Sequence, residues 1–151
     1  MKVKEIMTKK VFTLKPEDSL ADAIKLFRRK KITGAPVLDN GKLVGIITEK
    51  DILTSFALPE SPSPVSPPPF DFIEAMLEMK MSEWDLERAL ERIKEGRVED
   101  VMTKDVITID PDADVSDAVN LMTEHNINRI PVLKNGKLVG IVTRQDLLKA
   151  L

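Results

Sequence analysis

Two stretches of this chain are close copies of one another: PVLDNGKLVGIITEKDIL at residues 36–53 and PVLKNGKLVGIVTRQDLL at residues 131–148. The match extends outward without a gap, because residues 7–53 align with residues 102–148 at a constant offset of 95 and share 23 of 47 positions. A repeat of this quality fixes the organisation of the chain, since both copies must adopt the same local structure.

Each copy begins with a short strand and a helix. Val11–Leu14 is β-prone, and Ser19–Lys31 follows with apolar residues at helical spacing. Ser19 and Asp22 form a capping-box pattern at the start of this helix. The second copy places Asp114 and Asp117 at the same positions, so we expect the same cap there.

Each copy continues with a β-hairpin and a second helix. Asn40-Gly41 separates two apolar runs, as Asn135-Gly136 does in the second copy, and Asn-Gly supplies the two positive-φ residues of a type I′ turn. The sequence therefore predicts antiparallel strands at Pro36–Leu38 and Leu43–Ile47, and a helix that begins at Thr48.

The resulting order in each copy is β-α-β-β-α, and the predicted fold class is α/β (α+β). About 45 residues cannot easily close a core alone. We therefore expect the two copies to pack on each other about a pseudo-twofold axis.

The chain divides into three regions: a first copy at residues 1–57, an insertion at residues 58–97 and a second copy at residues 98–151. Residues 58–69 hold six of the ten prolines, a composition typical of an extended linker.

The rest of the insertion predicts two helices, at residues 72–81 and 83–95, with Gly96 ending the second. Their apolar side chains either pack against the repeats or form a Met-rich surface for a partner protein or a second subunit.

Composition excludes several classes of function. The chain has no cysteine and a net charge of −2, which speaks against thiol chemistry, Fe–S clusters and nucleic-acid binding. It has no run of ~18 apolar residues and no signal peptide, so we expect a cytoplasmic protein without a membrane partner. Phosphate-loop, dinucleotide, triad and metal motifs are also absent, which predicts no enzymatic activity, no catalytic residue and no metal site.

Both copies, IMTKKVFTLKPEDSLADAIKLFRRKKITGAPVLDNGKLVGIITEKDIL and VMTKDVITIDPDADVSDAVNLMTEHNINRIPVLKNGKLVGIVTRQDLL, resemble CBS motifs, named for cystathionine β-synthase. The tandem pair is similar to a Bateman module, here in a stand-alone CBS domain-containing protein. The resemblance implies two clefts between the motifs, which bind AMP, ADP, ATP or S-adenosylmethionine as regulatory ligands. It implies no required cofactor.

The Thr-x-x-Asp pattern that ends each copy has two interpretations. Thr48 with Asp51, like Thr143 with Asp146, is a capping box, which stabilises helices in proteins of every function. The carboxylate can also accept hydrogen bonds from both hydroxyls of a ribose, and the helix N-terminus can hold phosphate oxygens. The resemblance favours the ribose role.

The resemblance also implies that each cleft joins the end of one copy to the start of the other. One site would contain Thr143, Asp146, Thr8, Lys10, Val11, Ile32 and Thr33. The other would contain Thr48, Asp51, Thr103, Asp105, Val106, Ile127 and Asn128. In these sites Val11 and Val106 would offer backbone groups to adenine, although both also fit plain strand positions.

The resemblance implies that Arg129 occupies a position where CBS motifs often carry a basic side chain that binds phosphate. Its counterpart in the first copy is Gly34. The two clefts should therefore differ in affinity, and a phosphorylated ligand is favoured over S-adenosylmethionine.

The predicted function is that of a non-catalytic regulator. Binding of an adenosine nucleotide changes the orientation of the motifs and controls an unknown partner protein, and the protein is expected to be a homodimer. The alternative is a ligand-free scaffold that acts through its dimer and helical surfaces.

Overall fold

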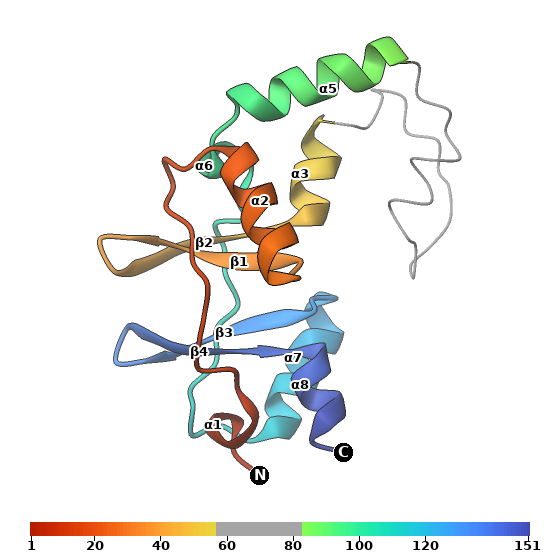
Figure 1. Ribbon diagram of the computed structural model, residues 1–151. Helices are drawn as coiled ribbons and strands as arrows, with labels where there is room; N and C mark the ends of the chain where they lie inside the picture. The colour runs from red at the N-terminus through yellow and green to blue at the C-terminus, as the bar shows by residue number, and fades with distance from the viewer. Residues whose placement is uncertain (57–82) are drawn as a thin grey trace.

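Two β-hairpins, one from each copy of the repeat, form the centre of the structure (Figure 1). The computed structural model describes residues 1–56 and 83–151. The hairpins are antiparallel and comprise β1 (Gly34–Asp39) with β2 (Lys42–Thr48), and β3 (Arg129–Lys134) with β4 (Lys137–Thr143).

The two-residue turns have the predicted type I′ character. Asn40 and Gly41 have φ values of 51° and 81°, and Asn135 and Gly136 have 53° and 78°. Positive φ at both central positions matches the twist of the flanking strands, so the Asn-Gly prediction is confirmed in both copies.

The predicted strand at residues 11–14 is wrong in extent. Only Leu14 pairs with the hairpin, as a parallel bridge to Val37, and Ile109 pairs in the same way with Val132. The preceding residues cross from the other half of the molecule, where Thr8 pairs with Ile141, and so reach their own hairpin only at Leu14 (Figure 1).

Two helices flank each hairpin. They are α2 (Leu20–Lys30) and α3 (Glu49–Phe56) in the first half, and α7 (Val115–His125) and α8 (Arg144–Lys149) in the second. Ser19 Oγ accepts a hydrogen bond from the backbone N–H of Asp22 at 3.0 Å, which confirms Ser19 as the N-cap of α2, although the reciprocal bond from the Ser19 N–H to the Asp22 side chain is not formed.

The predicted cap of α7 is wrong. Asp114 occupies the N-cap position but makes no side-chain capping hydrogen bond. Its carboxylate instead pairs with Lys2 Nζ at 3.4 Å, because the N-terminal segment forms a bridge with this position. A tertiary contact thus replaces a local one.

The halves exchange their first helices. α1 (Val3–Ile6) packs on the second half, where Val3 is fully buried in the core, and α6 (Val98–Val101) brings Val98 into the core of the first half. Each hydrophobic core therefore contains residues from both copies of the repeat, whose expected limits are residues 1–57 and 98–151.

The exchange follows the pseudo-twofold relation expected from the repeat. Thr8 pairs with Ile141, and Thr103 pairs with Ile46, so the two bridges are equivalent under the offset of 95. The repeat glycines make this approach possible: a Cβ on Gly45 would lie 2.5 Å from Met102 Sδ, and a Cβ on Gly140 would lie 2.6 Å from Met7 Sδ.

The predicted helix at residues 83–95 is confirmed as α5 (Glu83–Glu95), which packs against α2 and α3 (Figure 1). Gly96 follows it, although not in the left-handed conformation that commonly ends helices. A Cβ at this position would lie 2.5 Å from Leu20 Cδ1, so close packing explains the glycine.

The linker at residues 58–69 and the predicted helix at residues 72–81 lie outside the described residues. Among the helices that the structure describes, none is long and apolar enough to cross a bilayer.

Candidate functional site

Asp51 lies at the N-terminus of α3 in a reciprocal capping box. The Thr48 N–H donates to Asp51 Oδ2 at 3.0 Å, and the Asp51 N–H donates to Thr48 Oγ1 at 3.1 Å. The equivalent bonds between Thr143 and Asp146 measure 2.9 and 3.3 Å. The capping interpretation of Thr-x-x-Asp is therefore confirmed in both copies. It uses one carboxylate oxygen of each aspartate.

Arg129 extends from β3 of the second half to the first half. Its Nη2 donates a hydrogen bond to Thr33 Oγ1. Its guanidinium also occupies the space beside Gly34, where an added Cβ would lie 2.8 Å from Nη1. Gly34 and Arg129 are equivalent in the repeat, so this position can hold one long side chain but not two.

The surroundings of Asp51 and Arg129 perturb both groups. Burial raises the pKa of Asp51 above its ordinary 3.8, while the hydrogen bonds from Thr48 and the charge of Arg129 oppose that shift. Burial lowers the pKa of Arg129, and the carboxylates of Asp51 and Glu49 oppose the shift. In the described part of the chain Arg129 and Asp51 form no direct ion pair. The carboxylate and the guanidinium therefore share a partly desolvated site without satisfying each other fully.

Asp146 lies in a different environment. Thr8 Oγ1 is 3.2 Å from Asp146 Oδ1 and 3.3 Å from Oδ2, so its hydroxyl donates to the carboxylate across the two halves. This contact joins two residues assigned to one cleft from the sequence. A hollow of about 260 Å³ adjoins the aspartate, between α1 and α8, and is lined by Glu5, Ile6, Asp146, Lys149 and Ala150.

Thr103, the counterpart of Thr8, differs from it in the contact of its side chain but not in its backbone pairing. It pairs through its backbone with Ile46, at 2.8 and 3.0 Å. Within the described residues, however, its side chain makes no hydrogen bond to Asp51. The two aspartates are thus equivalent in sequence and capping but unequal in what covers them.

Thr33 and Asn128 do not lie as the sequence grouped them. The Thr33 carbonyl accepts a hydrogen bond from the Glu49 N–H at 2.9 Å, and Asn128 accepts one from Arg144 at the same distance. Each therefore contacts the start of the helix that follows the hairpin of its own copy. The hairpin register explains this, because Gly34, the residue after Thr33, pairs with Thr48 at the end of β2, and Arg129 pairs with Thr143 in the same way. The contacts of Thr33 place it on the Asp51 side.

The remaining predicted residues take part less directly. Ile32 and Ile127 pack against the first and second cores, respectively. The Val106 N–H donates to the Lys104 carbonyl at 3.1 Å. In the part of the chain described, no hydrogen bond or ion pair joins the side chains of these residues to either aspartate, and the same holds for Lys10, Val11 and Asp105.

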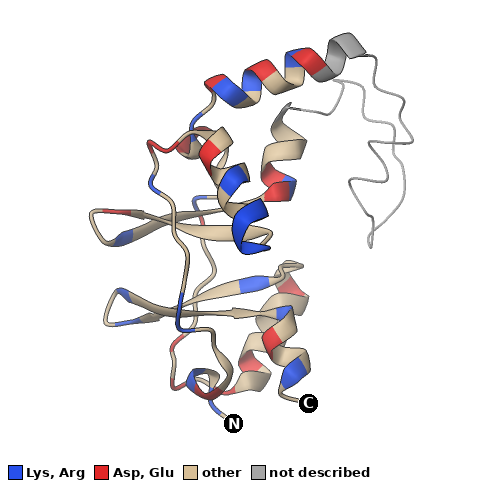
Figure 2. Ribbon diagram, in the orientation of Figure 1, with Lys and Arg blue, Asp and Glu red and all other residues tan. Residues whose placement is uncertain are grey.

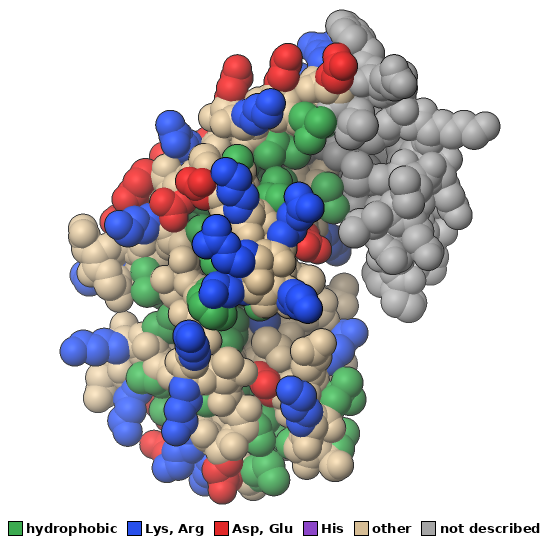
Figure 3. Space-filling model, in the orientation of Figure 1, with side chains coloured by type: hydrophobic (Ala, Val, Ile, Leu, Met, Phe, Trp, Pro, Cys, Tyr) green, Lys and Arg blue, Asp and Glu red, His purple; other side chains and the backbone are tan. Residues whose placement is uncertain are grey.

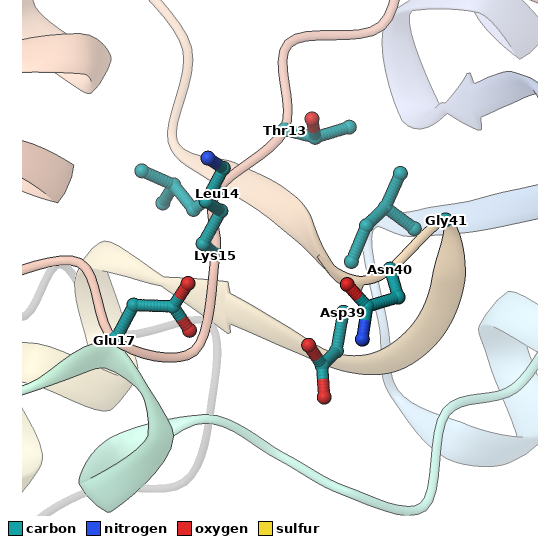
Figure 4. A pocket seen from close by; sticks show the side chains of 8 residues that line it. Thr13, Leu14, Lys15, Glu17, Asp39, Asn40 and Gly41 are labelled. Atoms are coloured by element: carbon teal, nitrogen blue, oxygen red, sulfur yellow. The ribbon is translucent and has the colours of Figure 1, made fainter.

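A larger hollow, of about 320 Å³, was not predicted from the sequence (Figure 4). It lies beside the β1–β2 turn and the segment around Leu14, which pairs with β1. Neither Asp51 nor Asp146 lines it. The lining residues are Thr13, Leu14, Lys15, Glu17, Leu38, Asp39, Asn40 and Gly41. The described residues contain no group of His, Cys, Asp or Glu side chains that could hold a metal ion.

Comparisons with known proteins agree with the repeat. Protein MJ1426 of Methanocaldococcus jannaschii is 43% identical over 154 residues, which span all of this chain and 91% of that protein. Other relatives from that organism are longer. This chain spans 39% of MJ1232, at 34% identity, and 23% of an inosine-5'-monophosphate dehydrogenase, at 31% identity.

Solved structures show the same fold. CBSX2 from Arabidopsis thaliana in complex with AMP superposes with a TM-score of 0.71 at 28% identity, over 99% of this chain and 94% of that one. The CBS domain pair of MJ0100, in complex with 5'-methylthioadenosine and S-adenosyl-L-methionine, superposes with a TM-score of 0.68 at 28% identity, with the same coverage.

A family model for the CBS domain matches residues 3–58 and again residues 98–151. These matches cover both copies of the repeat and more than half of the chain, and the protein therefore belongs to the CBS domain family as a tandem pair of motifs.

Proposed function

We propose that this CBS pair is a non-catalytic regulatory module that binds an adenosine nucleotide, AMP, ADP or ATP, beside Asp51. The observation that supports this function is the arrangement of Asp51 from the first half with Arg129 from the second. A carboxylate suits the two hydroxyls of a ribose, and a guanidinium suits the oxygens of a phosphate. Both groups are partly buried, which strengthens their interaction with a ligand.

The same arrangement provides a mechanism of regulation. A nucleotide that contacts Asp51 and Arg129 connects the two halves, so binding favours the relative orientation in which both contacts form. Phosphate would compete with Thr33 for the Arg129 guanidinium. The first half therefore senses the ligand partly through a residue of the second half, and the changed orientation would control a partner protein in the cytoplasm.

Arg129 also favours a phosphorylated ligand. Its positive charge attracts phosphate and repels the sulfonium of S-adenosylmethionine. The solved relatives include one complex with AMP and one with S-adenosyl-L-methionine, so both ligand chemistries occur among similar proteins. The cleft beside Asp146 would bind more weakly, because Thr8 already donates to that carboxylate.

Isothermal calorimetry with adenosine, AMP, ADP, ATP and S-adenosylmethionine tests the proposal. We expect AMP to bind the wild-type protein, Asp51→Asn to abolish binding at the main cleft, and Arg129→Gln to reduce affinity for AMP but not for adenosine. Asp146→Asn is the matched control, since it alters the equivalent capping box in the other cleft. Absence of binding by every compound would favour the alternative, a scaffold that acts through its surfaces.

A second copy of the chain is the proposed partner for the helical face of the second half. Val119 on α7 is 43% exposed and Leu148 on α8 is 63% exposed. Their counterparts, Ile24 and Leu53, are half-buried in the first half, where α5 packs against α2 and α3. No described helix covers α7 and α8 in the same way, so a homodimer would bury this apolar face.

A further inference from the structure

Seven exposed cations lie in the first copy of the repeat, five on α2 and its C-cap and two on the N-terminal segment that meets α2 at Phe12. All seven side chains are exposed, and in the described residues none of them forms an ion pair. Figure 3 shows Lys and Arg side chains gathered over this part of the molecule, and Figure 2 shows them at the C-terminal end of α2. We call this the α2 basic surface; it comprises Lys9, Lys10, Lys25, Arg28, Arg29, Lys30 and Lys31.

The fold does not require this charge. The equivalent positions of the second half are Lys104, Asp105, Asn120, Thr123, Glu124, His125 and Asn126. These carry a net charge of −1 with histidine neutral, whereas the α2 basic surface carries +7. Helices α2 and α7 nevertheless have the same length and the same left-handed C-cap. A favourable interaction of cations with the end of the helix dipole therefore cannot explain the whole cluster.

The cluster also has an energetic cost within the chain. Lys25 and Arg29 are four residues apart on one helix, a spacing at which like charges destabilise. Lys10 and Lys30 come from different segments, yet their Nζ atoms lie 5.8 and 4.9 Å from the centre of the same Phe12 ring. Cation–π attraction holds the two ammonium groups near each other without neutralising them. An anion brought from outside would relieve this repulsion.

We propose that the α2 basic surface is the docking surface for a short acidic segment of a partner protein. The charge distribution favours this occupant over a long polyanion. The whole chain carries −2, so the residues outside the surface together carry −9. An eleven-residue helix is roughly 16 Å long, a length that a short acidic segment can cover.

The location connects docking to the nucleotide cleft. Lys31 lies two residues before Thr33, which accepts the hydrogen bond from Arg129. Lys10 lies two residues after Thr8, which pairs with β4 of the second half. A bound acidic segment would thus contact the segments next to Thr8 and Thr33, both of which contact the second half of the molecule. The docking proposal itself does not rest on nucleotide binding.

The test uses a fluorescein-labelled peptide of about twelve residues with alternating Glu and Ser, followed by fluorescence anisotropy with the full chain. We expect binding that weakens as salt screens the charges. The triple variant Arg28→Gln, Arg29→Gln, Lys30→Gln should lose on the order of tenfold in affinity. The matched control Lys42→Gln, Lys134→Gln, Lys137→Gln removes three exposed cations at the hairpin turns and should change affinity by less than about twofold.

The proposal would be overturned by a lack of peptide binding to the wild-type protein, or by an equal loss of affinity in the control variant. Tight binding of duplex DNA or phosphatidylserine vesicles without peptide binding would also overturn it, in favour of those partners. Thermal melts of both variants confirm folding. AMP titrations of the same variants separate this surface from the cleft, because either proposal can fail while the other holds.

Discussion

Arg129 lies against Gly34, which is the equivalent residue in the first copy of the repeat. The contact is close, since a Cβ on Gly34 would lie 2.8 Å from Arg129 Nη1 and 2.9 Å from Cζ. A twofold axis brings equivalent residues together, and two arginines could not occupy this space. The repeat is therefore asymmetric at its centre, and the single guanidinium is directed toward Thr33 and Asp51.

Gly34→Ala should disturb the phosphate contact without removing any charge. The added methyl group would push the guanidinium away from its position, so affinity for AMP relative to adenosine should fall by about tenfold or less. Calorimetry on Gly34→Ala, Arg129→Gln and the double variant measures this. Because both substitutions act through one side chain, their effects should not add, and fully additive effects would contradict the arrangement.

Thr8→Val should strengthen binding at the second cleft. The substitution removes the hydroxyl that donates to Asp146, so the carboxylate oxygen Oδ1, which the capping box does not use, becomes available to a ribose. One hydrogen bond of this kind corresponds to roughly a three- to tenfold change in affinity. Thr103→Val is the matched control, because its hydroxyl makes no hydrogen bond to Asp51 in the described structure. Weaker nucleotide binding in Thr8→Val would instead show that Thr8 contacts the ligand itself.

Asp51→Asn should raise the melting temperature at neutral pH. Burial raises the pKa of Asp51 above 3.8, so the Asp51 carboxyl group holds its proton more tightly in the native state than in the unfolded chain. Between 3.8 and the raised native pKa, the free energy of unfolding contributed by Asp51 falls as pH rises. Above that window the ionised carboxylate lowers stability, and the neutral amide avoids this cost.

Melting curves from acidic to neutral pH test the assignment. The wild-type protein and Asp51→Asn should differ most at neutral pH and converge as pH falls below 3.8. Asp146→Asn controls for loss of a capping carboxylate at the equivalent position. A constant difference between wild type and Asp51→Asn at every pH would show that burial of the charge is not the cause.

Val119→Glu with Leu148→Glu should convert the expected dimer to a monomer. Both side chains are exposed apolar groups on the uncovered helices of the second half, and two carboxylates there would oppose burial. Sedimentation velocity measures the mass. Leu90→Glu on α5, where the side chain is 49% exposed, is the control and should leave the mass unchanged. A wild-type protein that sediments as a monomer would exclude this interface.

Local features were predictable from the sequence because short-range chemistry decides them. The Asn40-Gly41 turn needs two positive-φ residues, and the Ser19 cap needs only a neighbouring backbone N–H. Predictions that needed a distant segment were less successful. Residues 11–13 do not form a strand because they cross between the halves, and Asp114 pairs with Lys2 in place of capping its helix.

The sequence by itself determined the repeat, the hairpins, most helix limits and the capping boxes of Asp51 and Asp146, because each depends on residues within a few positions of one another. Only the tertiary structure decided which half each segment joins. The exchange of α1 and α6 brings Thr8 to Asp146, and the central axis brings Arg129 to Gly34. These contacts join residues about 95 or more positions apart, and long-range packing of this kind is set by the shape and burial of whole elements rather than by local pattern.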